Sequence, residues 1–348
     1  MDTNAKTPRL SIGLPVYNGS LHLREAITSL LSQDVGALEL VICDNASTDD
    51  TPEICAEFAA ADKRVRYTRN ETNIGAAPNF NRAFELCSGE YFMWGSHDDV
   101  WAPGFASACI ARLESHPGAV LCTSQVQLIG DDGAPKPADY EVIDTDGMNV
   151  EDRVFELLRR PVWYDMYSVF RPEALRATGM YSVTFGGDVH LLLELILLGD
   201  FLSAPQTLLS YRIPDTIKAP SDMTREIGVD AAKREQHDEP WSFLARDLTQ
   251  VLKESDLGAE TAQRVLSRFV EHLSSKESSW GRAILRERGW VLLPPVWIAK
   301  REIVATLGPQ KPATATVLAV KRAQTAVVRA GRRVKALGRG LRQRSSDR

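Results

Sequence analysis

The chain has 348 residues, of which 44% are hydrophobic, and a net charge of −5. This composition provides enough apolar surface for a packed core and excludes a wholly disordered protein. Residues 1–9 are polar, and no apolar run reaches the roughly 18 residues of a membrane-spanning helix, so we expect a non-secreted, cytoplasmic protein. The five cysteines include no CxxC pair, which predicts reduced thiols rather than a zinc site.

The charge is divided unevenly along the chain. Residues 311–348 contain 11 Lys or Arg and one acid, and the other 310 residues contain 30 basic and 45 acidic residues. A basic end on an acidic body is typical of an interaction tail. The interspersed apolar residues favour an amphipathic helix on an anionic membrane surface, with two tryptophans just upstream in Trp290–Trp297; a solvated, disordered end explains the pattern equally well. The tail has no aromatic residue for stacking, so we expect no nucleic-acid binding.

Apolar runs alternate with helical stripes along the first 130 residues. This alternation predicts βαβ units, and therefore an α/β fold with a mostly parallel central sheet flanked by helices. The predicted strands cover residues 9–14, 38–43, 65–68, 91–94 and 119–129, with helices over 21–31, from about Pro52, over 79–86 and over 103–113. Pro15 is expected to end the first strand. A strand over 167–170, a helix over 188–198 and a strand over 206–211 follow, and beyond about residue 222 the periodicity is only helical.

Three of the predicted strands end in polar clusters, and parallel α/β sheets bind their ligands beyond the carboxyl ends of the strands. The clusters are Pro15–Asn18, Asp44-Asn45 and Ser96–Asp99. The carboxylates of Asp98 and Asp99 repel each other unless a cation or hydrogen-bond donors compensate. The pair therefore predicts a Mg²⁺ or Mn²⁺ ion that is shared with a diphosphate, while a solvated helix cap is an equally good explanation.

Two further aspartates stand at the ends of predicted elements. Asp44 ends an apolar strand, where its carboxylate is able to accept an N–H group of a nucleotide base. Asp188 follows two glycines and opens an apolar helix, either as an N-cap or as a carboxylate that takes a proton. His190 and Glu194 lie one turn apart on this helix, and we expect an ordinary surface pair.

Several segments, in order and at ordinary spacing, resemble the family 2 glycosyltransferases of the GT-A fold. They lie between about residues 9 and 213 and comprise Leu14–Gly19, Glu39–Asp49, Asn73–Gly75 and Gly89–Pro103, extended by Tyr167–Arg171 and Gly187-Asp188. The resemblance implies a nucleotide-diphospho-sugar transferase fold for residues 1–222. We expect a helical C-terminal extension over residues 223–310 and the basic tail over 311–348.

The resemblance also implies roles for individual residues. The donor nucleotide would be bordered by Pro15, Tyr17, Asn18, Asp44, Asn45, Asn73 and Gly75, with Asp44 at the base. Asp98, near the ribose, and Asp99, on the metal, resemble the DXD element, and Asp188 resembles the catalytic base. Three positions depart from the family pattern, because Ser96 replaces an Asp, Gly187 replaces a Glu, and Ile213 stands where many relatives carry a His.

We therefore expect a metal-assisted, inverting, hexosyltransferase-like glycosyltransferase that acts in cell-envelope or polysaccharide biosynthesis. Its donor would be a nucleotide-diphosphate sugar, and its acceptor a hydroxyl of a glycan or a lipid-linked molecule. The tail would hold the enzyme peripherally on the inner face of the cell membrane. The alternative is a catalytically inactive sugar-nucleotide-binding or scaffold protein. A nicotinamide oxidoreductase is not expected, because no GxGxxG motif follows the first strand.

The acceptor side is less defined by the sequence. Trp163, Tyr164 and Tyr167 offer aromatic rings on which an acceptor sugar can stack, and packing in the core explains them as well.

Overall fold

The computed structural model describes residues 7–137, 142–160, 164–213, 239–275, 278–287 and 303–304. The chain divides into two compact units, Met1–Leu307 and Gly308–Arg348, and the second lies outside the described residues. The predicted basic tail and the segment Trp290–Trp297 also lie outside them. The domain boundaries expected near residues 222 and 310 stay predictions.

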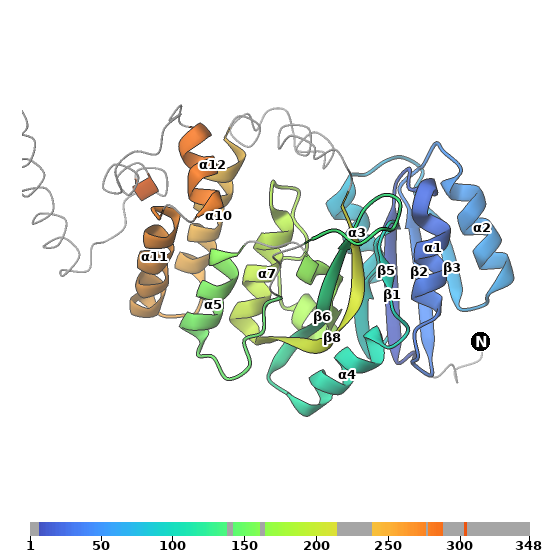
Figure 1. Ribbon diagram of the computed structural model, residues 1–348, viewed down its shortest axis with the longest axis horizontal. Helices are drawn as coiled ribbons and strands as arrows, with labels where there is room; N and C mark the ends of the chain where they lie inside the picture. The colour runs from blue at the N-terminus through green and yellow to red at the C-terminus, as the bar shows by residue number, and fades with distance from the viewer. Residues whose placement is uncertain are drawn as a thin grey trace, which may run out of the picture. The chain divides into compact units, whose positions relative to one another are not determined.

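The centre of the first unit is a mixed, mostly parallel sheet (Figure 1). In the described residues it has eight strands in the order β3-β2-β1-β4-β7-β6-β8-β5. Strands β1 to β4 are parallel to one another, β7 is antiparallel to both β4 and β6, and β8 returns parallel to β6. The strands are β1 Leu10–Val16, β2 Leu38–Asp44, β3 Val65–Arg69, β4 Tyr91–Trp94, β5 Val100–Trp101, β6 Ala119–Ile129, β7 Val169–Phe170 and β8 Asp200–Arg212.

Helices cover both faces of this sheet, as the alternation of strands and helices predicts. The helices of the N-terminal half are α1 Ser20–Leu31, α2 Thr51–Ala61, α3 Ala76–Glu85 and α4 Phe105–Ser115. The later ones are α5 Val150–Arg159, the 3-10 turn η1 Tyr164–Tyr167, α6 Pro172–Arg176, α7 Gly187–Leu198, α10 Pro240–Glu254, α11 Ala259–Leu273 and α12 Ser279–Glu287. The last three confirm the predicted helical C-terminal region.

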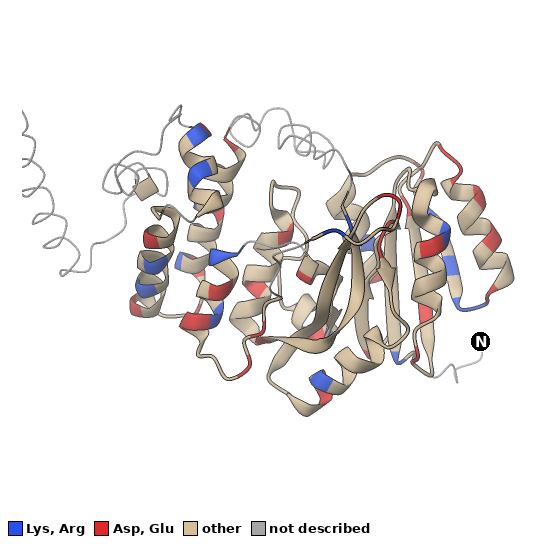
Figure 2. Ribbon diagram, in the orientation of Figure 1, with Lys and Arg blue, Asp and Glu red and all other residues tan. Residues whose placement is uncertain are grey.

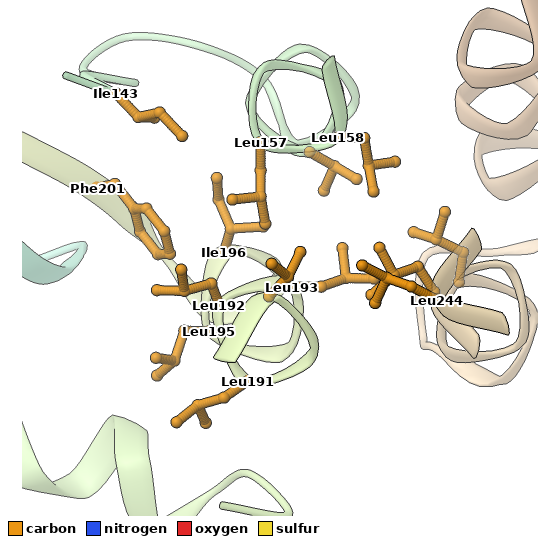
Figure 3. Packing of buried hydrophobic residues seen from close by; sticks show 14 of the residues in the cluster. Ile143, Leu157, Leu158, Leu191, Leu192, Leu193, Leu195, Ile196, Phe201 and Leu244 are labelled. Carbon is orange, nitrogen blue, oxygen red and sulfur yellow. The ribbon is translucent and has the colours of Figure 1, made fainter. Parts of the chain in front are cut away.

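Two apolar cores lie on the two faces of the sheet. Because side chains alternate along a strand, Phe92 and Trp94 of β4 pack on one face, while Met93 packs on the other. The core on the Phe92 face is filled by α5, α7 and the C-terminal helices, and Figure 3 shows Leu193 of α7 on the side toward Leu244 and Leu192 on the side toward Phe201. The core on the opposite face is filled by α1, α2 and α4. Charged residues gather on the helices and loops and leave most of the sheet uncharged (Figure 2).

Two local predictions are wrong. Pro15 does not end the first strand, because β1 continues to Val16. The pairing of β1 with β4 ends at Gly13, and at Pro15 β1 pairs with β2 alone. A proline, which has no backbone N–H to donate, is tolerated at such a position. The helix predicted from residue 103 begins only at Phe105 as α4, and the unpredicted strand β5, which contains Trp101, pairs antiparallel with β8.

The C-terminal strands also differ from the predicted ranges. β8 runs from Asp200 to Arg212, longer than the predicted 206–211, and its pairing with β6 contains irregular register shifts that hide the alternation in the sequence. Residues 164–167 form the turn η1, so that only Val169–Phe170 are left in β7. None of the helices in the described part of the chain is long and apolar enough to cross a membrane.

Candidate active site

The loop after β1 is braced by the loop after β2. The backbone N–H of Asn18 donates to Oγ of Ser47 (2.9 Å), and Oδ1 of Asn18 accepts from the backbone N–H of Thr48 (2.8 Å). Asn18 has a positive φ of 49°, a conformation that Asn tolerates better than most residues. Pro15 is buried beneath this loop, while the Tyr17 side chain is 46% exposed at the carboxyl edge of the sheet.

Asp44 lies at the same edge and is completely buried. Its Oδ1 accepts from the backbone N–H of Ser47 (2.8 Å), and its Oδ2 accepts from the Tyr67 hydroxyl (2.9 Å) and from Nε of Arg69 (3.0 Å). Both oxygens are thus occupied by the protein itself, and a contact between Asp44 and a base stays a prediction. Arg69 is 47% exposed beside it and was not predicted as a site residue, although a basic residue directly after the predicted strand 65–68 was the available signal.

A network of amide side chains brings together three of the predicted donor-site residues. Nδ2 of Asn45 donates to Oδ1 of Asn73 (2.8 Å) and to the carbonyl oxygen of Gly75 (3.1 Å), and Oδ1 of Asn73 accepts from the backbone N–H of Gly75 (2.8 Å). The positive φ of Gly75, 91°, allows the tight turn into α3. Oδ1 of Asn45 accepts from the backbone N–H of Ile74 (2.9 Å), whose side chain remains 42% exposed. This network holds the loop after β3 against the end of β2.

Asp99 is buried, with one carboxylate oxygen bonded and the other not. Oδ1 accepts from the backbone N–H of Arg212 (2.7 Å), whereas Oδ2 has no hydrogen-bond partner among the residues that the structure describes. Burial, together with the neighbouring charge of Asp98, raises the pKa of Asp99 well above its ordinary value. The helix-cap interpretation of this pair is wrong, because α4 has Gly104 at its N-cap.

Arg212 organises this corner of the site. Its buried guanidinium donates from Nε to the carbonyl oxygen of Asp98 (2.7 Å), from Nη1 to that of Gly130 (2.8 Å) and from Nη2 to Oε2 of Glu25 (2.9 Å). One side chain therefore joins the end of β8 to the loops after β4 and β6 and to α1. Arg212 was not among the predicted site residues, because no local signal in the sequence distinguishes a buried Arg at the end of a strand.

Asp188 is half-buried in the first turn of α7. It is not the N-cap, a position held by Gly186 at φ 70°, and its Oδ1 accepts from the backbone N–H of Val189 (2.9 Å). The charge of Asp188 acts on the phenol of Tyr211, and so do the charges of Asp98 and Asp99. Burial raises the pKa of Tyr211 well above its ordinary value, and the charges of Asp99, Asp98 and Asp188 raise it further.

The tyrosines of η1 pack on Tyr211. The ring centroids of Tyr164 and Tyr211 are 4.2 Å apart, and those of Tyr167 and Tyr211 are 6.2 Å apart. Asp99 raises the pKa values of both η1 tyrosines, although burial is the larger cause. Tyr164, Tyr167 and Tyr211 therefore form one aromatic cluster. Trp163 is outside the described residues.

The described residues could hold a divalent ion only if a bound ligand supplied further oxygen atoms to it. Among the described residues, no group of three or more His, Cys, Asp or Glu is arranged to hold a metal ion. Asp99 nevertheless offers a buried, unpartnered carboxylate oxygen, and Mg²⁺ and Mn²⁺ often take the rest of their oxygens from substrate phosphates and water. The apolar Ile213 offers no further ligand.

Residues 11–176 match the model of the family described as glycosyl transferase family 2. This stretch of the chain is similar to glycosyltransferase family 2. An uncharacterized protein of Mycobacterium tuberculosis is 36% identical over 121 residues, which are 34% of this chain and 35% of that protein. The putative glycosyltransferase EpsE of Bacillus subtilis is 34% identical over 110 residues, 31% of this chain and 40% of EpsE.

The fold of the chain also resembles solved glycosyltransferase structures. Residues 1–349 of S. aureus TarS in complex with UDP-GlcNAc superpose with a TM-score of 0.60 at 15% identity, over 86% of this chain and 89% of that one. The predicted GT-A-type fold is thereby confirmed. In sequence, the chain spans little more than a third of the length of the curated relatives described above.

Proposed function

We propose that this chain is an inverting, hexosyltransferase-like glycosyltransferase that moves a sugar from a nucleotide diphosphate to an acceptor hydroxyl. The observation that carries the proposal is the buried carboxylate of Asp99, which is held through Oδ1 by the Arg212 backbone and has no partner at Oδ2 among the described residues. In-line attack needs charge neutralisation at the leaving group and a base at the acceptor, and Asp98-Asp99 and Asp188 would fill these two roles. The TarS structure holds UDP-GlcNAc, which supports a nucleotide sugar as the donor class.

The nucleotide would lie over the loops after β1, β2 and β3. Tyr17 and Ile74 expose apolar surface there, and aromatic rings stack well on nucleotide bases. Asp44 would act by holding the guanidinium of Arg69, which keeps donor groups for the carbonyl oxygens of a base. Asn45 would shape this wall through its hydrogen bonds to Asn73 and Gly75.

The diphosphate would lie at the loop after β4, with Asp98 near the ribose. Asp99 is the residue that would hold a Mg²⁺ or Mn²⁺ ion, which supplies a Lewis acid to neutralise the departing diphosphate. Because the Arg212 amide already occupies Oδ1 of Asp99, Oδ2 is the oxygen left to face a ligand.

Asp188 would act as general base on the acceptor side. Its carboxylate would take the proton of the acceptor hydroxyl as that oxygen bonds to the anomeric carbon and the bond to the diphosphate breaks, which inverts the configuration. Tyr164 and Tyr211 would form the wall on which an acceptor sugar stacks.

For the acceptor we propose a glycan or a lipid-linked saccharide of the cell envelope or of a polysaccharide. A cytoplasmic enzyme could reach such an acceptor at the inner face of the membrane through its basic tail, residues 311–348. The support is the amphipathic, basic composition of the tail, which lies outside the described residues.

A turnover assay tests the proposal against an inactive sugar-nucleotide-binding or scaffold protein. The full chain is incubated with Mn²⁺, one of a panel of nucleotide sugars and saccharide acceptors, and release of nucleoside diphosphate is measured beside thermal stability. A donor that raises the melting temperature and is turned over supports the enzyme. A donor that raises it without any turnover supports the inactive binding protein, and a β product from an α donor, read by NMR, supports inversion.

A further inference from the structure

Helix α10 lies along the turn and the helix that carry Asp188. Three side chains spaced three residues apart on α10, those of Trp241, Leu244 and Asp247, make the contacts. Residues three apart lie on neighbouring positions of one helix face, so the contacts form a continuous stripe. Figure 3 shows Leu244 of α10 directed toward Leu193 of α7.

The first two contacts set the path of the turn before Asp188. The Trp241 ring packs edge-on against the ring of Phe185, with centroids 5.3 Å apart and an interplanar angle of 78°. Gly186 has a positive φ, and a Cβ built on it would lie 2.7 Å from the methyl groups of Leu244. The turn is therefore restricted both by its own backbone conformation and by α10 packed against it.

The third contact is an ion pair with α7 itself. Nδ1 of His190 lies 2.5 Å from Oδ2 of Asp247, and both side chains are largely buried. The same ring faces Glu194 through Nε2 at 3.9 Å. His190 is two residues from Asp188 on the same helix, so a shift at this pair would also shift the first turn. The expected pair between His190 and Glu194 is present, but the closer partner of His190 comes from α10.

Helix α10 is in turn held by α12. The carboxylate of Glu287 accepts from the backbone N–H groups of Trp241 (2.8 Å) and Ser242 (2.9 Å) at the start of α10. These are N–H groups that a helix leaves unpaired at its N-terminus. Glu287 therefore holds the N-terminal end of α10, where the stripe of contact residues begins.

We propose that α10 positions the catalytic base, with Trp241, Leu244 and Asp247 as positioning residues that set the first turn of α7. This inference rests on the proposed role of Asp188. In this arrangement the C-terminal helical region is part of the catalytic machinery, although it contributes no group to the reacting atoms. A shift of about 1 Å in a catalytic group costs up to about 10²-fold in rate, so small movements of α10 are sufficient.

The test compares Asp247→Asn and Asp247→Glu with a matched control, Arg264→Gln. The first variant removes the charge that faces His190, and the second keeps it. The control breaks another inter-helix ion pair of the same region, between Arg264 of α11 and Glu151 of α5 (2.7 Å), away from α7. Each variant is examined by hydrogen–deuterium exchange of residues 185–191, by kcat for transfer and by donor KM, after thermal unfolding confirms that it folds.

The expected result separates Asp247 from the control. Asp247→Asn should speed exchange in residues 185–191 and lower kcat on the order of 10-fold, with donor KM unchanged because the nucleotide loops lie elsewhere. Asp247→Glu should restore most of kcat, and Arg264→Gln should alter neither quantity. Unchanged exchange in Asp247→Asn, or an equal effect in the control, would overturn the proposal.

The exchange measurement does not depend on turnover. If exchange rises only in Asp247→Asn while the wild-type chain transfers no sugar, the coupling of α10 to this turn holds and the proposed glycosyltransferase function fails. If wild-type transfer is robust and Asp247→Asn keeps full kcat despite faster exchange, the positioning role is wrong and the proposed function stands.

Discussion

The backbone N–H of Arg212 donates a 2.7 Å hydrogen bond to Oδ1 of Asp99, although the two residues are 113 positions apart. The last residue of β8 thereby orients a buried carboxylate in the loop after β4. The Arg212 side chain strengthens the same junction through Asp98, Gly130 and Glu25. The proposed leaving-group site thus depends on the C-terminal end of the sheet.

Arg212→Met should destabilise the protein. The substitution keeps a long apolar side chain but removes the hydrogen bonds from the guanidinium to the carbonyl oxygens of Asp98 and Gly130 and the ion pair with Glu25, and a lost hydrogen bond to a charged group costs about 1–3 kcal/mol. We expect the free energy of unfolding in urea to fall by about 2–4 kcal/mol. Arg24→Met, which breaks an exposed pair with Glu57, is the control and should change the free energy of unfolding far less, because solvent screens exposed ion pairs. A small effect at Arg212 would contradict its role as an organiser.

Asp99→Ala should abolish transfer and leave the fold intact. The proposed metal and diphosphate lose their carboxylate, while the only described hydrogen bond removed is the one from Arg212. The measurement is turnover with added Mn²⁺, paired with circular dichroism. Retention of near-wild-type turnover by the variant after chelation and dialysis would exclude the metal role.

Asp188→Asn should lose on the order of 10²- to 10⁴-fold in kcat, because the amide is nearly isosteric but cannot take a proton. Donor KM should change little, since the proposed role of Asp188 is on the acceptor side. The check is steady-state kinetics with the donor varied at saturating acceptor. An equal loss of donor affinity would instead place Asp188 in the donor site.

Asp165 on η1 should make the stability depend on pH. It is buried, neither carboxylate oxygen has a hydrogen-bond partner among the described residues, and burial raises its pKa to about 7. The unfolded chain releases this proton near pH 4, so the folded state is penalised progressively from about pH 4 up to about pH 7. Asp165→Asn removes the penalty, and its stability relative to wild type should rise by about 2–3 kcal/mol between pH 5 and pH 8. Urea unfolding at the two pH values measures it, and a difference that does not vary with pH would show that Asp165 finds a partner.

The basic tail should bind anionic membranes. Sedimentation with liposomes of rising anionic content compares the full chain with one truncated after Gly308. Binding that increases with anionic lipid, falls with salt and is lost on truncation is the expected result, because Lys and Arg near such a surface are attracted within a Debye length. If both proteins stay in the supernatant at low salt, attachment through residues 311–348 is excluded.

Much of the fold was predictable because it is encoded locally. The alternation of apolar strands and helical stripes predicted β1, β2, β4 and β6 to within about two residues. The polar clusters after these strands marked the carboxyl edge, because parallel strands place their ends together. The Asp98-Asp99 pair was visible for this reason, since two adjacent carboxylates after a buried strand stand out in the sequence alone.

The sequence by itself determined the class of fold, the edge that carries the site and the candidate carboxylates, because periodicity and strand ends are properties of neighbouring residues. Only the tertiary structure showed that Asp44 is enclosed by Tyr67 and Arg69, and that Arg212 orients Asp99. Only the tertiary structure placed Asp247 beside His190, 57 positions away. These contacts join elements that meet through packing of the whole sheet, and the direction of a side chain across such a distance is decided by that packing rather than by its sequence neighbours.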